Sequence, residues 1–148
     1  MTRNITVERT VAAPRAAVWE VLADYPNISD WSPGVLNSYA ISDQLDGVGA
    51  QRQTELAPDG SMRMRETVAE WVAERRMVVD IDEIEQQPVT SATMTFTLTD
   101  HGESTLTTMG YDYEADAELG PLLDEQFTGG FNFLLDALEQ AAKARSAD

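Results

Sequence analysis

The sequence predicts an α+β fold with a seven-stranded antiparallel sheet, two short helices after the first strand and a long C-terminal helix. Short segments of alternating apolar and polar residues recur through the middle of the chain. Residues that turn easily separate these segments, which favours an antiparallel meander over alternating strand–helix units. Near the C-terminus the apolar residues change to helical spacing.

The N-terminal elements are marked by a change of period. A strand is expected at 5–11, where apolar residues alternate with polar ones. Pro14 stops this strand and suits the first turn of a helix, which we expect to extend to about Asp24. The helix breaks there because the residue before Pro26 is pushed out of the helical region. A second short helix or turn follows at Asn27–Trp31.

Six further strands are expected between turn signals. They are Val35–Ser42, Ala50–Leu56, Met62–Trp71, Arg76–Asp82, Val89–Thr99 and Ser104–Tyr113. The breaks between them are Asp46-Gly47-Val48-Gly49, Pro58-Asp59-Gly60, Ala73-Glu74, Gln86-Gln87-Pro88 and Asp100-His101-Gly102. Ala73-Glu74 is the weakest of these turn signals, because it contains none of the strong turn formers.

The last element is a long amphipathic helix, expected to start near Leu119 and to fray after Ala144. Gly129-Gly130 lies inside it, and each glycine costs about 1 kcal/mol relative to alanine in a helix interior. We therefore expect a kink or a close contact at this pair.

Length and composition exclude several classes of protein. At 148 residues the chain suits one domain spanning 1–148. It contains no cysteine and a single histidine, His101, which we place at a surface hairpin tip. A histidine–thiolate metal site is therefore excluded, and a serine–histidine triad is not expected. We expect neither a metal nor a cofactor.

Charge limits the partners. The chain carries 26 acidic and 10 basic residues, a formal charge of −16. Such a surface repels phosphate backbones and anionic lipid headgroups, so nucleic acid is not an expected partner. The sequence has no apolar run long enough to span a bilayer and no secretory leader, so we expect no integral membrane association and a cytoplasmic location.

Motifs in the first third of the chain resemble a known superfamily. The segments are 11–19 (VAAPRAAVW), 22–25 (LADY), 30–35 (DWSPGV) and 47–50 (GVGA). They are similar to the opening signature of the polyketide cyclase/dehydrase and START-like (SRPBCC, Bet v 1-like) superfamily. The predicted element order also matches the helix-grip arrangement of that superfamily over nearly the whole chain, which implies a curved seven-stranded antiparallel sheet wrapped around the long C-terminal helix.

The resemblance implies a cavity between the sheet and the C-terminal helix. Relatives are described as polyketide cyclases and aromatases, lipid carriers, quinone-binding proteins, and hormone or flavonoid binders. Binding or transport of a small, largely apolar ligand (a lipid, polyketide or quinone-like molecule) is the leading expectation, with the protein a monomer or homodimer. A cyclase, aromatase or dehydratase acting in the same cavity is the alternative. A partner-binding module is a third class, and the acidic surface disfavours ribosomal RNA contact for it.

Candidate site residues come from the faces expected to turn toward this cavity. The cavity candidates are Trp31, Tyr39, Met64, Glu66, Phe96, Met109, Tyr111, Phe127, Phe131 and Leu134. As catalytic groups that polarise a carbonyl or move protons, the candidates are Arg65, Glu66 and Tyr111. The enzyme hypothesis needs at least two of these three groups in one pocket.

Several of these assignments leave alternatives open. In Met62–Trp71 one register turns Glu66 inward and the other turns Arg65 inward, unless a bulge shifts the register or the charges lie on the solvent rim. Arg9 shares the buried face of the first strand and reaches the cavity, an inner ion pair or the sheet end. Tyr111 and Tyr113 share one face of the last strand, and either face can turn inward. The tryptophans Trp19 and Trp31, and Phe127 with Phe131, also suit plain core packing.

Overall fold

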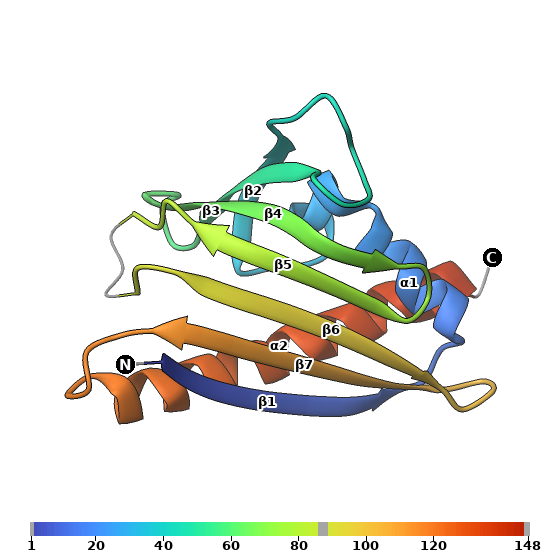
Figure 1. Ribbon diagram of the computed structural model, residues 1–148. Coiled ribbons are helices and arrows are strands. Elements are labelled where there is room, and N and C mark those ends of the chain that lie inside the picture. Colours follow the sequence, from blue (N-terminus) through green and yellow to red (C-terminus); the bar gives the residue numbers. More distant parts are fainter. Residues whose placement is uncertain (1, 86–88, 147–148) are drawn as a thin grey trace.

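The computed structural model describes residues 2–85 and 89–146. Seven strands and the helices follow in the predicted order (Figure 1). The elements are β1 (Thr2–Val11), α1 (Arg15–Ala23), η1 (Tyr25–Asp30, a 3₁₀ helix), β2 (Val35–Ala40), β3 (Gln51–Leu56), β4 (Met62–Val72), β5 (Arg76–Asp82), β6 (Ala92–Asp100), β7 (Thr105–Glu114) and α2 (Gly120–Ser146).

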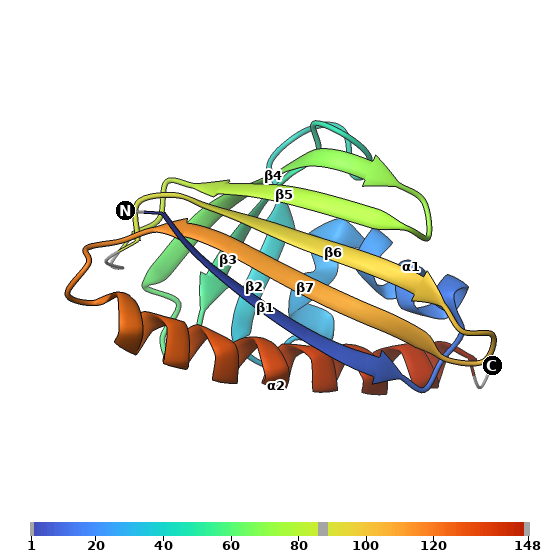
Figure 2. The same ribbon diagram turned by 60° about the horizontal axis from the view of Figure 1, so that its bottom comes forward.

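All strands form one antiparallel sheet in the order β1-β7-β6-β5-β4-β3-β2. Consecutive strands from β2 to β7 are neighbours, and β1 pairs with β7 to form the edge strand opposite β2. Figure 2 shows the sheet curling so that α2 runs along its inner face, while α1 packs at one end. The predicted helix-grip fold is therefore confirmed.

The inner face of the sheet carries the core. In β6, Met94, Phe96 and Leu98 are buried and alternate with half-buried threonines. In β7, Met109, Tyr111 and Tyr113 point inward in the same way. This is the period of two that a strand with one buried face requires.

A bulge in β4 resolves the ambiguity of that strand. Met64, Glu66 and Val68 face inward, and the register against β5 shifts between Val68 and Glu70. The extra residue reverses the alternation, so Trp71 contacts α1, where its ring lies 5.0 Å from that of Trp19 in an edge-to-face arrangement. Without the bulge Trp71 would face solvent.

Two side-chain clusters fasten α2 to the edge of the sheet. Near its first turn, the Asp124 carboxylate accepts hydrogen bonds from Arg3, with Nη2 at 2.6 Å, and from the Tyr113 hydroxyl. Near its other end, Glu139 accepts from Arg9 at 2.7 Å and from the Ala12 backbone N–H at 2.8 Å. Arg9 is thus occupied by α2 and does not enter a cavity.

The boundaries differ from the sequence prediction by a few residues, and one feature of α2 differs in kind. β2 ends at Ala40 and β6 begins at Ala92, inside the predicted limits, while α2 continues to Ser146. The predicted break at Gln86-Gln87-Pro88 lies outside the described residues. α2 runs through Gly129-Gly130 without interruption, and a Cβ at either glycine would meet nothing within 4 Å. The predicted close contact there is wrong, because this part of α2 borders open space.

Candidate functional site

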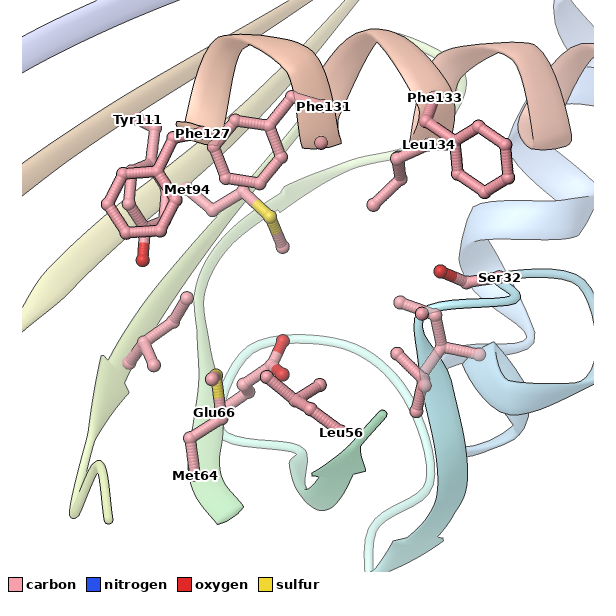
Figure 3. A pocket seen from close by; sticks show the side chains of 15 residues that line it. Ser32, Leu56, Met64, Glu66, Met94, Tyr111, Phe127, Phe131, Phe133 and Leu134 are labelled. Carbon is pink, nitrogen blue, oxygen red and sulfur yellow. The ribbon is translucent and has the colours of Figure 1, made fainter. Parts of the chain in front are cut away.

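A cavity of about 300 Å³ lies between the inner face of the sheet and the middle of α2 (Figure 3). Every layer of the fold contributes to its wall. The lining residues are Ile28, Ser32, Gly34, Val35, Leu56, Met64, Glu66, Ile81, Met94, Tyr111, Phe127, Gly130, Phe131, Phe133 and Leu134. Most of these side chains are apolar, as in sites for small organic molecules.

Aromatic rings form the wall where α2 meets β7. Phe127 and Phe131 lie one helical turn apart on α2, with their rings nearly parallel and 5.9 Å apart. The ring of Tyr111 lies 4.7 Å from that of Phe131 and 5.1 Å from that of Phe127. Figure 3 shows these three rings together beside Met94. This cluster supplies a largely apolar surface with ring faces and edges available to a ligand.

Glu66 is buried on the opposite side of the cavity, held by neighbouring strands. Arg52 of β3 lies directly across the ladder from it and donates to Glu66 Oε1 from Nη2 at 2.7 Å and from Nε at 3.2 Å. The Thr54 hydroxyl donates to Glu66 Oε2 at 2.8 Å. All three residues are at most 5% exposed. A charged pair at this depth is retained only when its remaining polar atoms are also bonded, as they are here.

Arg52 also connects this pair to η1. Its Nη1 donates to the Tyr25 backbone oxygen at 2.8 Å, and its guanidinium carbon lies 4.0 Å from the centre of the Tyr25 ring. The Tyr25 hydroxyl donates back to the Glu66 backbone oxygen at 2.9 Å. Burial raises the pKa of Tyr25 well above its ordinary value. The positive charge of Arg52 opposes this shift, and the negative charge of Glu66 adds to it. Tyr25 therefore acts as a protonated hydrogen-bond donor.

Two hydroxyl groups face the cavity without a hydrogen-bond partner among the described residues. They belong to Tyr111 and Ser32, which are 5% and 4% exposed, and Figure 3 shows both oxygens directed into the open space. Burial, and secondarily the Glu66 charge, raises the pKa of Tyr111 far above its ordinary value. The Tyr111 hydroxyl thus stays protonated at neutral pH and is available to donate a hydrogen bond.

The described residues bring no three His, Cys, Asp or Glu side chains together as a metal site would require. Chemically, the cavity combines one carboxylate with two hydroxyl groups in an apolar enclosure. This arrangement can orient a small organic molecule, and Glu66 and Tyr111 line the same cavity.

Six of the sequence-predicted cavity residues line the cavity. They are Met64, Glu66, Tyr111, Phe127, Phe131 and Leu134. The helical ones share one face of α2, and the strand ones share the inward face of the sheet, which is one of the two faces that alternation alone leaves open in those strands.

Four predicted residues lie elsewhere. Phe96 and Met109 point inward, but they face each other across β6 and β7 in the solid core and are 2% and 1% exposed. Trp31 is partly buried and packs against that core at the end of η1. Tyr39 is 42% exposed on the edge strand β2. Correct facing is therefore insufficient, because the cavity opens under only part of the sheet.

Arg65 and Tyr113 form their hydrogen bonds outside the cavity. Arg65 faces outward and forms a bidentate pair with Asp82 at 2.8 Å, which lowers the pKa of that carboxyl. The Tyr113 hydroxyl donates to Asp124, and burial and that carboxylate raise the pKa of Tyr113 to about 12. His101 lies exposed in the β6–β7 turn. Of the three catalytic candidates, the cavity thus holds Glu66 and Tyr111.

Sequence reasoning missed Arg52, Thr54 and Ser32. Arg52 and Thr54 belong to a strand with little apolar alternation, which hid its inward face. A usable signal was the short β3–β4 hairpin. If Leu56 pairs with Met62, counting four residues back along β3 and four forward along β4 puts Arg52 opposite Glu66. Ser32 follows η1 and carries no comparable pattern.

Comparison with known proteins bears on this cavity. The model of the family described as polyketide cyclase/dehydrase and lipid transport matches residues 2–143. The search of curated proteins finds no match. Within the described chain no helix is both long and apolar enough to cross a membrane.

Solved structures share the fold at low sequence identity. An aromatase/cyclase, Zhui, from Streptomyces sp. R1128 is 18% identical with a TM-score of 0.82, covering 98% of this chain and 96% of its own. Ara h 8.0201 is 12% identical with a TM-score of 0.81, covering 97% and 99%. Norcoclaurine synthase from Thalictrum flavum, in complex with dopamine and hydroxybenzaldehyde, is 22% identical with a TM-score of 0.73, covering 95% and 86%. The family and the shared fold support ligand binding or cyclase activity in general.

Proposed function

Because the chain belongs to the polyketide cyclase/dehydrase and lipid transport family, we propose that it binds a small, largely apolar ligand in the cavity between the sheet and α2. The observation that carries the proposal is the cavity itself: about 300 Å³, with mostly apolar walls and two unpartnered hydroxyl groups among the described residues. Its volume is at the low end of the roughly 300–1,000 Å³ typical of small-molecule sites. A compact ligand with a few rings fits this space better than a long-chain lipid.

Native mass spectrometry of the purified protein, followed by denaturing extraction, tests this proposal. A stoichiometric small molecule recovered unchanged would support a carrier and identify its chemical class. If the protein is empty, titration with compact aromatic molecules is the second arm. Saturable binding of one molecule per chain supports the proposal, and no binding in either arm contradicts it.

Catalysis is the second candidate, favoured by one observation. Glu66 and Tyr111 face the same cavity, so one ligand can contact a carboxylate and a hydroxyl donor at once. An aromatase/cyclase and norcoclaurine synthase are among the proteins of the same fold. On this hypothesis Tyr111 polarises a carbonyl while Glu66 orients or accepts a proton from the substrate.

One substitution separates the two candidates. Tyr111→Phe removes the hydroxyl and keeps the ring, so an enzyme loses turnover while binding persists. A carrier loses only part of its affinity. A cytoplasmic location and a monomeric or homodimeric state stay predictions, testable by fractionation and by light scattering.

A further inference from the structure

We propose that the cavity, if it is the ligand site inferred above, selects neutral or cationic aromatic molecules bearing an O–H or N–H donor and rejects carboxylates of the same size. The proposal goes beyond an apolar pocket because it specifies the sign of charge that the ligand carries. It rests on how the charges around Glu66 are placed.

The carboxylate of the buried Glu66–Arg52 pair is the charge that faces the ligand. Glu66 is the one ionisable acid or base among the described lining residues other than Tyr111. Its counter-ion Arg52 does not line the cavity. Two nitrogens of Arg52 donate hydrogen bonds to Glu66, and the third donates to the Tyr25 backbone oxygen. A ligand therefore meets the negative end of the buried pair, with the positive end behind it.

The Glu66 carboxylate can accept a further hydrogen bond. An ionised carboxylate offers about four acceptor positions and no donor. Arg52 and Thr54 together supply three hydrogen bonds to Glu66, which leaves capacity for a further donor. An O–H or N–H on the ligand fills it. A ligand carboxylate instead brings a second anion to the same low-dielectric space, with no free cation in the described lining to compensate.

Two hydroxyl groups at separate points of the cavity wall add neutral hydrogen-bonding groups. The hydroxyls of Tyr111 and Ser32 supply neutral hydrogen bonds, which an alcohol, phenol or carbonyl oxygen accepts without bringing a charge. The rings of Tyr111, Phe127 and Phe131, with centres 4.7–5.9 Å apart, favour edge and offset contacts with another ring. A protonated amine gains in addition from Glu66 and from these ring faces.

The test uses three probes that share one ring system: naphthalen-2-ol, naphthalene-2-carboxylate and naphthalen-2-ylmethylammonium. Dissociation constants are measured by calorimetry at neutral pH and about 0.15 M salt, which screens the −16 surface charge beyond roughly 8 Å. We expect the alcohol and the ammonium to bind at least tenfold more tightly than the carboxylate, a difference of about 1.4 kcal/mol. Carboxylate binding that is equal or tighter overturns this inference and leaves the proposed ligand site standing. Absence of binding by all three overturns both.

Variants assign the selectivity to Glu66 rather than to overall charge. Glu66→Gln exposes the ligand to the Arg52 charge, so carboxylate affinity rises at least tenfold relative to that of the alcohol. The matched control is Glu70→Gln, on the same strand but 47% exposed at its side chain and paired with Arg76, which changes net charge equally and leaves the ratio unchanged. Should Glu66→Gln not fold, the double variant Arg52→Met, Glu66→Leu replaces the whole pair. We expect its dissociation constants for the alcohol and the carboxylate to differ by less than threefold. A ratio that stays at the wild-type value in the folded variant overturns the inference.

Discussion

The sheet side and the helix side of the cavity are held in place by different forces. On the sheet side, Glu66 is fixed by directional hydrogen bonds from Arg52 and Thr54, and Arg52 also binds the Tyr25 carbonyl. On the helix side, Phe127 and Phe131 make only ring and apolar contacts. The polar wall therefore sets geometry and charge, whereas the apolar wall sets volume and tolerates small adjustments.

The largest expected effect comes from splitting the buried pair. Glu66→Gln leaves the Arg52 guanidinium buried without its counter-charge, which should lower the free energy of unfolding by about 3–5 kcal/mol. Urea unfolding measures it. Glu70→Gln breaks an exposed pair and should cost about 1 kcal/mol or less. Equal losses in the two variants would show that the sheet side is not held by this pair.

Removing a ring from the helix side should cost less and change what fits. Phe131→Ala deletes a half-buried ring, so we expect a loss of about 2 kcal/mol, below the 3–5 kcal/mol of a fully buried phenylalanine. The enlarged cavity should gain affinity for anthracen-2-ol relative to naphthalen-2-ol. The control Leu122→Ala alters a residue that is 53% exposed on the same helix. If the preference between the two probes does not move, Phe131 does not limit the volume.

The Tyr111 hydroxyl lies between the two walls and should matter for the ligand alone. Since it bonds to none of the described residues, Tyr111→Phe should change unfolding free energy by less than about 0.5 kcal/mol. Affinity for 6-acetyl-2-naphthol, which offers a donor and a carbonyl, should fall about fivefold, or about 1 kcal/mol. Tyr39→Phe, on the exposed edge strand, is the matched control. A large loss of stability would mean that the hydroxyl serves the fold.

The one expected gain in stability is on the helix side. A Cβ at Gly129 meets nothing within 4 Å, so Gly129→Ala should stabilise the protein by about 1 kcal/mol through helix propensity. Thermal unfolding measures the gain, and naphthalen-2-ol affinity should stay constant. Gly102→Ala is the opposite control, because Gly102 has a φ of +82° that alanine adopts only with strain. Destabilisation by Gly129→Ala would reveal a packing need at this position.

Periodicity and turn chemistry account for the fold prediction. The threonine-alternating strand β6 and the amphipathic α2 each show one period over many residues, so their type was predictable. The turn at Ala73-Glu74 was harder, because Glu74 adopts a φ of 64° without being glycine, asparagine or aspartate. The sequence allows a bulge in β4 as one alternative but does not locate it, since its position depends on pairing with β5 rather than on local sequence.

The site was predictable only as far as facing decides it. Alternation groups Met64 with Glu66 and Met109 with Tyr111 without deciding which face turns inward, and it gives Phe96 and Met109 the same weight as the residues that line the cavity. The difference between them is position along the strand, which the curvature of the sheet over α2 determines. Arg52 went unnoticed because a buried arginine is uncommon and becomes understandable only with its partner.

The buried pair also shapes how this protein can change over generations. Unfolding free energies of natural domains are about 5–15 kcal/mol, so losing about 3–5 kcal/mol at Glu66 or Arg52 alone removes much of the reserve. A lineage can therefore reach a new charge preference here only by nearly simultaneous replacement of both residues, or after stabilising changes elsewhere such as at Gly129. Ring-size preference faces no such barrier, since the α2 wall changes one residue at a time. Descendants of this chain should accordingly diversify in ligand shape sooner than in ligand charge.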